Sequence, residues 1–175
     1  MTGFPPTPFW DFSLAVYGRA GVAPACLALQ ERHGADVNLL LFGAWIGAAG
    51  HGRLTADDFS DLDRLVSDWH RRVVRHLRAL RVDLCGGLDP LPGDLVAEVR
   101  RRIQKVELDA EHAEQVVLAE WARDRAVIEL AKETALADAA ANMMAYVATL
   151  TPRPDEADRT DIDAVLAGCA GWLAA

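Results

Sequence analysis

The chain has 175 residues, of which 51% are hydrophobic and 25% charged, and its formal net charge is −8. A chain of this length can bury a core without disulfides or metal, and its composition excludes wholesale disorder, so we expect one domain over residues 1–175. The negative charge opposes non-specific attraction to nucleic acid or anionic lipid and argues against both as partners.

Apolar residues recur at three- and four-residue steps along most of the chain, and no run alternates as a strand does. This pattern predicts an all-α, single-domain helical bundle with a long antiparallel helical hairpin. Its expected parts are an apolar helical core at 9–52, long helices at 55–150, a linker at 151–160 and a closing helix at 161–174.

Two short helices are expected at the start of the core. The first begins near Trp10, with Asp11 or Ser13 as its cap, and glycines interrupt it. Pro24 fits the first turn of the second helix, which ends near Gly34.

Asp36 is predicted to cap a third helix, which is apolar on nearly all sides as far as Gly50. Such a helix is typical of the centre of a bundle. Its Gly43-x-x-x-Gly47 spacing offers a small-residue face that permits close approach of a neighbouring helix.

A long helix follows Thr55, which is expected to cap it together with acidic residues in the first turn. Its apolar seam comprises Phe59, Leu62, Val66, Trp69, Val73, Leu77, Leu80 and Leu84. A Gly- and Pro-rich break at 86–93 separates it from a second seam, so the two helices are predicted to be antiparallel. The sequence leaves open whether a turn at 123–125 ends the second helix, although compactness favours a turn.

The three cysteines are Cys26, Cys85 and Cys169. They are far apart, include no CxxC pair and sit among apolar neighbours, which predicts buried thiols in a reducing compartment. The first eight residues do not resemble a signal peptide, and no segment reaches the ~18 to 20 apolar residues that span a bilayer. A cytoplasmic location without membrane association is therefore expected.

Several short stretches of the N-terminal part carry a family resemblance: Phe9-Trp10-Asp11-Phe12-Ser13, Tyr17, Gly21-Val22, Ala25-Cys26-Leu27, Leu29-Gln30, Asp36-Val37-Asn38-Leu39-Leu40-Leu41 and Trp45. Together they resemble a conserved family of uncharacterised bacterial proteins over roughly the first half of the chain. The resemblance implies a bacterial, cytoplasmic, helical protein. It implies no particular activity and no catalytic residue.

The pair Asp109-x-x-His112 resembles half of the carboxylate and histidine pair that di-iron bundles use twice. No other histidine has an acidic residue three positions before it, so a solvated helix face is favoured over a metal site. Glu107, Glu111 and Glu114 share a helix face and are interpreted as a pairing surface for cations. We expect no metal, no cofactor and no catalytic set of residues.

The basic residues point to a binding surface. Those expected to contact a partner are Arg71, Arg75, Arg78, Arg81, Arg100, Arg101 and Lys105. In an antiparallel hairpin they meet at one end, with Arg71, Arg75 and Arg78 turned away from the apolar seam and exposed. The leading functional hypothesis is therefore a non-catalytic protein that binds a protein partner with an acidic surface, and homo-oligomerisation is left open.

The alternative hypothesis is an enzyme or small-molecule carrier whose site lies in the aromatic and polar N-terminal half. Its candidate ligand-binding residues are Trp10, Asp11, Tyr17, Gln30, Asp36, Asn38 and Trp45. Polar groups beside aromatic rings can line a pocket, whereas helix capping explains several of them without any ligand. A cavity bordered by Trp10, Asp11 and Asn38 is the observation that would favour the alternative.

Overall fold

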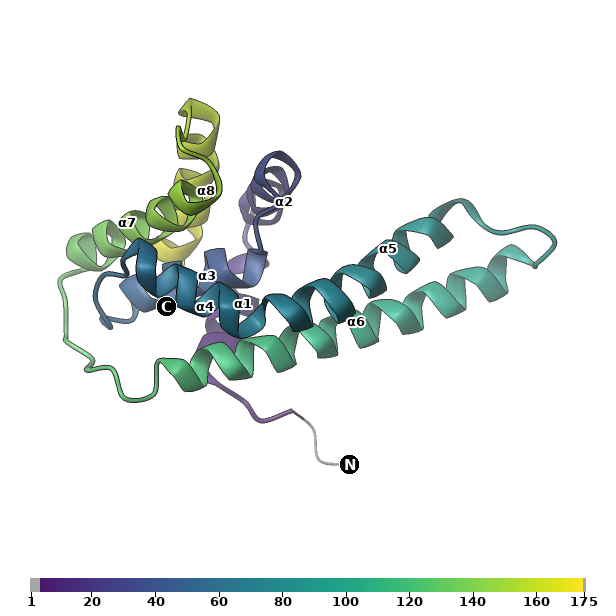
Figure 1. Cartoon of the computed structure of the whole chain (residues 1–175), viewed down its shortest axis with the longest axis horizontal. Coiled ribbons are helices and arrows are strands. Elements are labelled where there is room, and N and C mark those ends of the chain that lie inside the picture. Colours follow the sequence, from purple (N-terminus) through teal and green to yellow (C-terminus); the bar gives the residue numbers. More distant parts are fainter. Residues whose placement is uncertain (1–3, 175) are drawn as a thin grey trace.

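The computed structural model of the protein describes residues 4–174, and every regular element in this range is a helix or helical turn, which confirms the all-α prediction. The elements, shown in Figure 1, are α1 (Pro8–Tyr17), α2 (Val22–His33), α3 (Val37–Ala48), α4 (Ala56–Trp69), a π-helical turn (His70–Val74), α5 (Arg75–Asp83), a 3-10 turn (Leu84–Gly86), α6 (Gly93–Trp121), α7 (Lys132–Leu150) and α8 (Glu156–Trp172).

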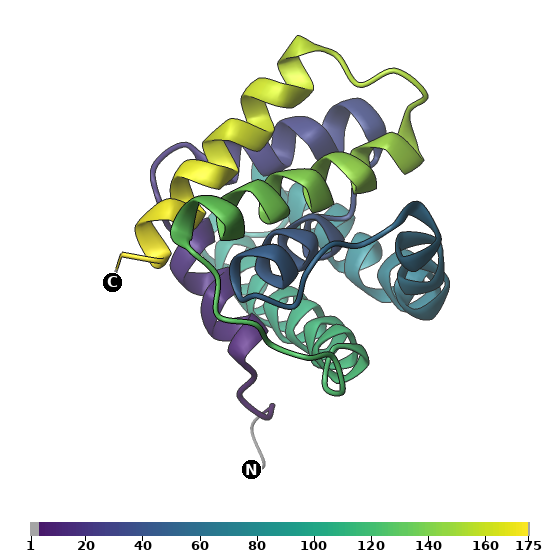
Figure 2. The same cartoon turned by 90° about the vertical axis from the view of Figure 1, so that its left-hand side faces the viewer.

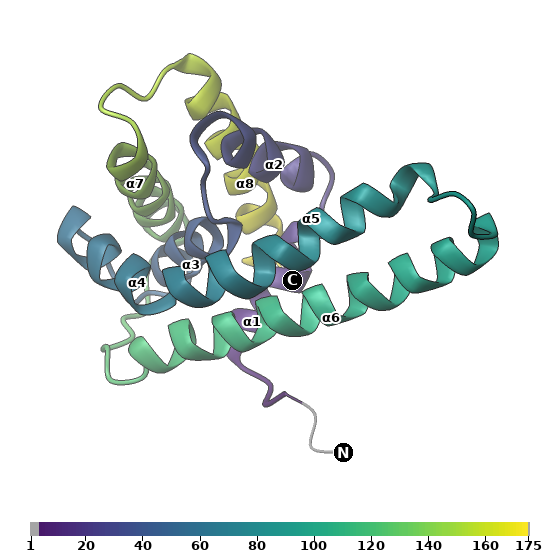
Figure 3. The same ribbon diagram turned by 45° about the vertical axis from the view of Figure 1, so that its right-hand side comes forward.

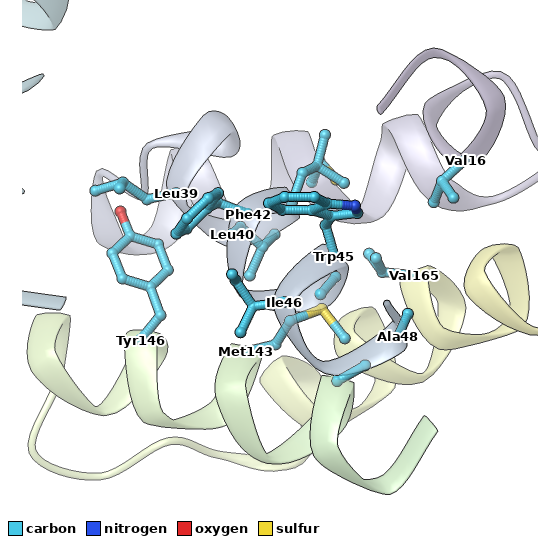
Figure 4. Close-up of a cluster of buried hydrophobic side chains, with 14 of the residues drawn as sticks. Val16, Leu39, Leu40, Phe42, Trp45, Ile46, Ala48, Met143, Tyr146 and Val165 are labelled. Carbon is cyan, nitrogen blue, oxygen red and sulfur yellow. The ribbon is translucent and has the colours of Figure 1, made fainter. Parts of the chain in front are cut away.

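Helix α3 is the centre of the core, as its apolar sequence predicts. Every residue from Asn38 to Ala48 is buried, and Figure 4 shows Met143 and Tyr146 of α7 directed toward α3. Gly43 and Gly47 lie where α7 approaches α3 most closely. Helices α2, α7 and α8 pack together beside α3, and α1, α4 and α6 cover the rest of it (Figure 2).

Side-chain caps fix the starts of several helices. Asp36 caps α3, and Thr55 forms a capping box with Asp58 at the start of α4, as expected. The predicted cap of α1 is wrong, because Thr7 rather than Asp11 or Ser13 accepts the hydrogen bond from the backbone N–H of Trp10. Helix α1 therefore begins at Pro8.

The linker predicted at 151–160 is shorter than expected. Asp155 and Asp158 form a capping box, so α8 begins at Glu156 and takes up the second half of that segment. The question left open at the end of α6 is also settled, since α6 ends at Trp121 and an irregular segment at 122–131 precedes α7.

Helices α4 and α5, joined by the π-helical turn, lie side by side with α6 and run in the opposite direction (Figures 1 and 3). Trp69 of α4 donates a hydrogen bond from its indole nitrogen to the carbonyl of Ala110 in α6, at 3.0 Å. The outer ends of α5 and α6 extend beyond the rest of the molecule, so their apolar residues have few neighbours. Leu80, Leu95 and Val99 are each about half exposed.

Two of the three cysteines are buried as expected. Burial raises the pKa of both Cys26 and Cys169 to about 12, so these thiols are inert at neutral pH. Cys85 is exposed instead, because it lies in the 3-10 turn at the outer end of α5, where the core does not reach. Within residues 4–174, no single helix combines the length and apolar character needed to cross a membrane.

Candidate functional site

A cleft of about 580 Å³ opens between α1, α2 and α3 on one side and α5 and α6 on the other, with the π-helical turn at its inner end. The elements that surround it can be followed in Figure 3. The lining residues are Trp10, Ser13, Leu14, Tyr17, Leu27, Gln30, Asp36, Val37, Asn38, Leu41, His70, Arg78, Arg81, Arg101, Gln104, Lys105, Glu107, Leu108, Glu111 and Gln115.

Most of the predicted ligand-binding residues meet in this cleft. The residues that line it are Trp10, Tyr17, Gln30, Asp36 and Asn38. Asp11 lies on the exposed side of α1 and does not contribute. Trp45 also lies elsewhere, because it is buried in the core, where its ring is stacked on Phe9 at 5.4 Å between centroids.

Part of the predicted basic surface lines the same cleft. The lining residues are Arg78, Arg81, Arg101 and Lys105, whereas Arg71, Arg75 and Arg100 lie outside it. The basic residues and the aromatic-polar residues were predicted to serve two competing functions. The fold brings members of both sets together at one site.

Carboxylates neutralise several of the basic residues. Arg78 contacts Glu107 at 3.0 Å and Glu111 at 2.5 Å, and Arg81 contacts Glu107. Arg71 and Arg101 pair with Asp68 and Glu98, each three residues earlier in the chain. The expectation that Arg78 is exposed and free is therefore wrong: its side chain is only 22% exposed, because it turns toward α6.

Three ionisable side chains meet at the inner end of the cleft. Asp36 is the cap of α3, His70 begins the π-helical turn and Glu114 belongs to α6. His70 Nδ1 lies 2.9 Å from Asp36 Oδ2 and 3.2 Å from Glu114 Oε2. The Glu114 side chain is fully buried and that of Asp36 is 9% exposed. Buried charges are costly unless they are paired, so a protonated His70 stabilises the ionised form of each carboxylate, whereas the two carboxylates oppose each other's ionisation.

The short distances between Asp36, His70 and Glu114 shift the pKa of each group. Burial would lower the pKa of His70, but the hydrogen bonds to Asp36 and Glu114 raise it to about 10. Burial likewise opposes ionisation of Asp36, yet the hydrogen bond from His70 keeps its pKa below the ordinary value. Burial and the neighbouring Asp36 charge raise the pKa of Glu114 to about 7, although the hydrogen bond from His70 opposes the shift.

Two amides orient this cluster. Asn38 donates through Nδ2 to Glu114 Oε1 at 2.9 Å, and its Oδ1 accepts from Gln115 Nε2 at 2.8 Å. The backbone N–H of Asn38 donates to Asp36 Oδ1, also at 2.8 Å. Asn38, one of the candidate ligand-binding residues, therefore connects the two buried carboxylates.

Two buried polar atoms beside the cleft have no hydrogen-bond partner among residues 4–174, namely Ser13 Oγ and Gln115 Oε1. Both residues line the cleft, and both are at least 96% buried. Buried polar atoms are usually hydrogen-bonded in native proteins, so these two atoms are available to a bound water or to a ligand.

The Asp109-x-x-His112 pair is not part of the charged cluster. His112 is buried, against the expectation of a solvated face, and its ring is stacked on Trp10 at 3.9 Å between centroids. His70 was not predicted to bind a metal, because no acidic residue lies three positions before it in the chain. Two predictions pointed to this cluster: Asp36 was a candidate ligand-binding residue, and the carboxylate stripe of α6 was interpreted as a pairing surface. In that stripe Glu107 and Glu111 pair with arginine, and Glu114 contacts His70.

The fold and the cleft together define a helical protein with a partly polar binding cleft formed by segments distant in sequence. The chain belongs to the family described as "Protein of unknown function (DUF2390)", whose model matches residues 8–118. The matched span contains every residue that lines the cleft, and it confirms the resemblance to an uncharacterised family. Searches of curated proteins and of solved structures gave no match.

Proposed function

We propose that this protein binds a small organic molecule in the cleft between α1, α2, α3, α5 and α6. The observation that carries the proposal is the pair of unsatisfied buried atoms, Ser13 Oγ and Gln115 Oε1, in a cleft large enough for a ligand. Of the three residues expected to border such a cavity, Trp10 and Asn38 do so and Asp11 does not.

The lining defines the chemistry of the ligand. Gln115 Oε1 can only accept a hydrogen bond, so the ligand carries a hydroxyl or amine donor at that point. Trp10, Leu14 and Leu108 offer apolar surface to the remainder of the molecule. Lys105, which is exposed at the rim, attracts a negatively charged substituent.

Replacing Ser13 by alanine separates ligand binding from stability. Because Ser13→Ala removes a buried hydroxyl that the free protein leaves unsatisfied, we expect the unliganded protein to keep its stability or gain up to about 1 kcal/mol. Ligand affinity is expected to fall about tenfold, as one hydrogen bond is lost. Ligands are to be found by native mass spectrometry of the purified protein and by thermal-shift screening, and affinities measured by calorimetry.

Ser60→Ala is the matched control, since the Ser60 hydroxyl is exposed on α4 and bonds only the carbonyl of Ala56. It should leave ligand affinity unchanged. A ligand that binds equally well to wild type and Ser13→Ala, or one whose protection from hydrogen exchange maps outside the cleft, would count against the proposal.

Self-association is a second candidate, favoured by the apolar outer part of α5 and α6. Leu95, Val99 and Val106 are spaced to share one face of α6 and are each at least 50% exposed, and Leu80 of α5 is 48% exposed. An exposed apolar face on a two-helix hairpin is typically buried against a second hairpin, which completes a four-helix bundle with two-fold symmetry.

Light scattering tests this candidate. We expect a concentration-dependent dimer that Val99→Glu converts to a monomer, because a buried unpaired carboxylate is costly. Val127→Glu, at a 66% exposed position in the segment after α6, is the control and should leave the dimer intact. A monomeric wild-type protein at high concentration excludes self-association through this face.

Binding of a protein partner with an acidic surface also stays a proposal. It is now supported chiefly by Arg75, Arg100 and Lys105, which form no ion pair with another side chain among residues 4–174.

A bacterial cytoplasmic location is proposed on the family resemblance and on the free thiols of the three cysteines.

A further inference from the structure

Three potential metal ligands from distant parts of the chain meet at the inner end of the cleft. One donor atom each of Asp36, His70 and Glu114 lies within 4.8 Å of the other two. Two carboxylates and one imidazole form a mixed oxygen and nitrogen donor set. From this arrangement we infer that Asp36, His70 and Glu114 bind one divalent first-row transition-metal ion, of the class of Mn²⁺, Fe²⁺ or Zn²⁺.

The spacing of the donor atoms fits a common ion. Ligand atoms about 2.1 Å from one metal are about 3.0 Å apart at octahedral angles and about 3.4 Å apart at tetrahedral angles. His70 Nδ1 lies 2.9 Å from Asp36 Oδ2 and 3.2 Å from Glu114 Oε2, within or close to that range. An ion can therefore replace the proton that His70 shares with the carboxylates with little movement of the side chains.

Asn38 holds one oxygen of each carboxylate, and the other oxygen of each faces His70. Asp36 Oδ1 accepts from the backbone N–H of Asn38, and Glu114 Oε1 accepts from its side-chain amide. Gln115 in turn fixes the amide of Asn38. Such outer hydrogen bonds orient the ligands of metal sites.

The backbone places His70 at the site by a local irregularity. His70 is the first residue of the π-helical turn between α4 and α5, and its carbonyl accepts from the N–H of Arg75. Single π-helical turns re-aim side chains within a helix and are frequent at functional sites. A π-helical turn holds one more residue than an α-helical turn. This additional residue lets Val66 and Val74 both stay buried while His70 reaches Asp36.

The cleft supplies the remaining coordination positions. Asp36 and His70 line it, so an ion at their donor atoms faces the open volume with three protein ligands on its inner side. Three ligands with an open side are typical of metal sites that bind water or substrate, and imidazole with carboxylates suits Mn²⁺, Fe²⁺ and Zn²⁺ better than Ca²⁺ or Mg²⁺. A dication also balances the two buried carboxylates.

The metal site does not depend on an organic ligand, so it is tested with metal ions alone. Protein stripped with a chelator is titrated with Mn²⁺ and, separately, with Zn²⁺. Binding of Mn²⁺ is measured by the loss of the free-ion electron paramagnetic resonance signal, and binding of Zn²⁺ is measured by calorimetry. We expect one bound ion per chain and a melting temperature that rises with metal concentration. Asn38→Ala is expected to weaken binding by about 10- to 100-fold, because it removes the side-chain amide that holds Glu114 in place.

His70→Gln and Glu114→Gln are expected to abolish stoichiometric binding while the circular dichroism spectrum stays helical. His76→Gln is the matched control and should leave binding unchanged, because His76 is exposed near the start of α5 and its ring contacts the carbonyl of Arg71. The inference is overturned if wild-type protein binds neither Mn²⁺ nor Zn²⁺ and shows no thermal shift, or if both ligand variants bind as wild type does. The wild-type titration decides the matter even if a variant fails to fold.

Discussion

Gly47→Ala is expected to lower the free energy of unfolding by about 3 kcal/mol, because a methyl group at this position has no room. It would overlap the backbone nitrogen and Cα of Ala139 in α7, and backbone atoms cannot rotate away as a side chain can. The two helices would have to separate across the most extensive helix–helix contact among residues 4–174. Urea unfolding, followed by circular dichroism at 222 nm, measures the difference.

The comparison with two other glycines isolates the cause. At Gly43 the added methyl group meets the far end of the Phe59 ring at 3.0 Å, so a smaller loss is expected. At Gly86 nothing lies within 4 Å and the backbone does not need a positive φ, so Gly86→Ala should be neutral or slightly stabilising. Equal stability of the Gly47 and Gly86 variants would show that α3 and α7 do not pack this closely.

The sequence predicted those parts of the fold that local chemistry decides. The uniformly apolar run after Asp36 identified the central helix, and Asp36 and Thr55 were recognised as caps because short polar side chains precede apolar runs. The start of α8 was missed because Pro152 and Pro154 extend the appearance of a linker up to Asp155. The predicted helix boundary was wrong where the capping residue lay among other turn-forming residues.

The site could be predicted only in pieces. Periodicity assigned an apolar face to each helix, but it did not determine which polar residues of α1, α3 and α6 face one another across the cleft. His70 was not recognised because the π-helical turn that re-aims it leaves almost no trace in the apolar pattern. Asp36 was interpreted as a cap or as a site residue, and it is both, since one oxygen caps α3 and the other contacts His70.

Asp158 is expected to stabilise the contact between α2 and α8 by about 2 kcal/mol at neutral pH. Its side chain is fully buried, and Oδ1 accepts from Arg32 at 2.8 Å and contacts His33 Nε2 at 2.7 Å. Its other oxygen accepts from the backbone N–H of Asp155, which completes the cap of α8. Breaking a fully buried pair costs about 3–5 kcal/mol, and the smaller value here reflects Arg32, whose side chain is 32% exposed.

The stabilising effect of Asp158 should disappear in acid. Burial would raise its pKa, but the hydrogen bonds from the Asp155 backbone, Arg32 and His33 hold it at about 2. An aspartate in an unfolded chain has a pKa of about 3.9, so the folded state favours the ionised form. The contribution is therefore fully present above about pH 5 and is lost as the pH falls toward 2.

Urea unfolding of wild type and Asp158→Asn between pH 7 and pH 2 tests both the size and the sign of this effect. The asparagine keeps the shape of the side chain and cannot ionise, so the difference in unfolding free energy should be about 2 kcal/mol at pH 7 and should shrink as the pH falls below about 4. Asp163→Asn, an exposed position on the same helix, should show no such trend. A constant difference across the whole pH range would mean that Asp158 stabilises the helix contact through its shape and its hydrogen bonds to neutral donors, without a contribution from its charge.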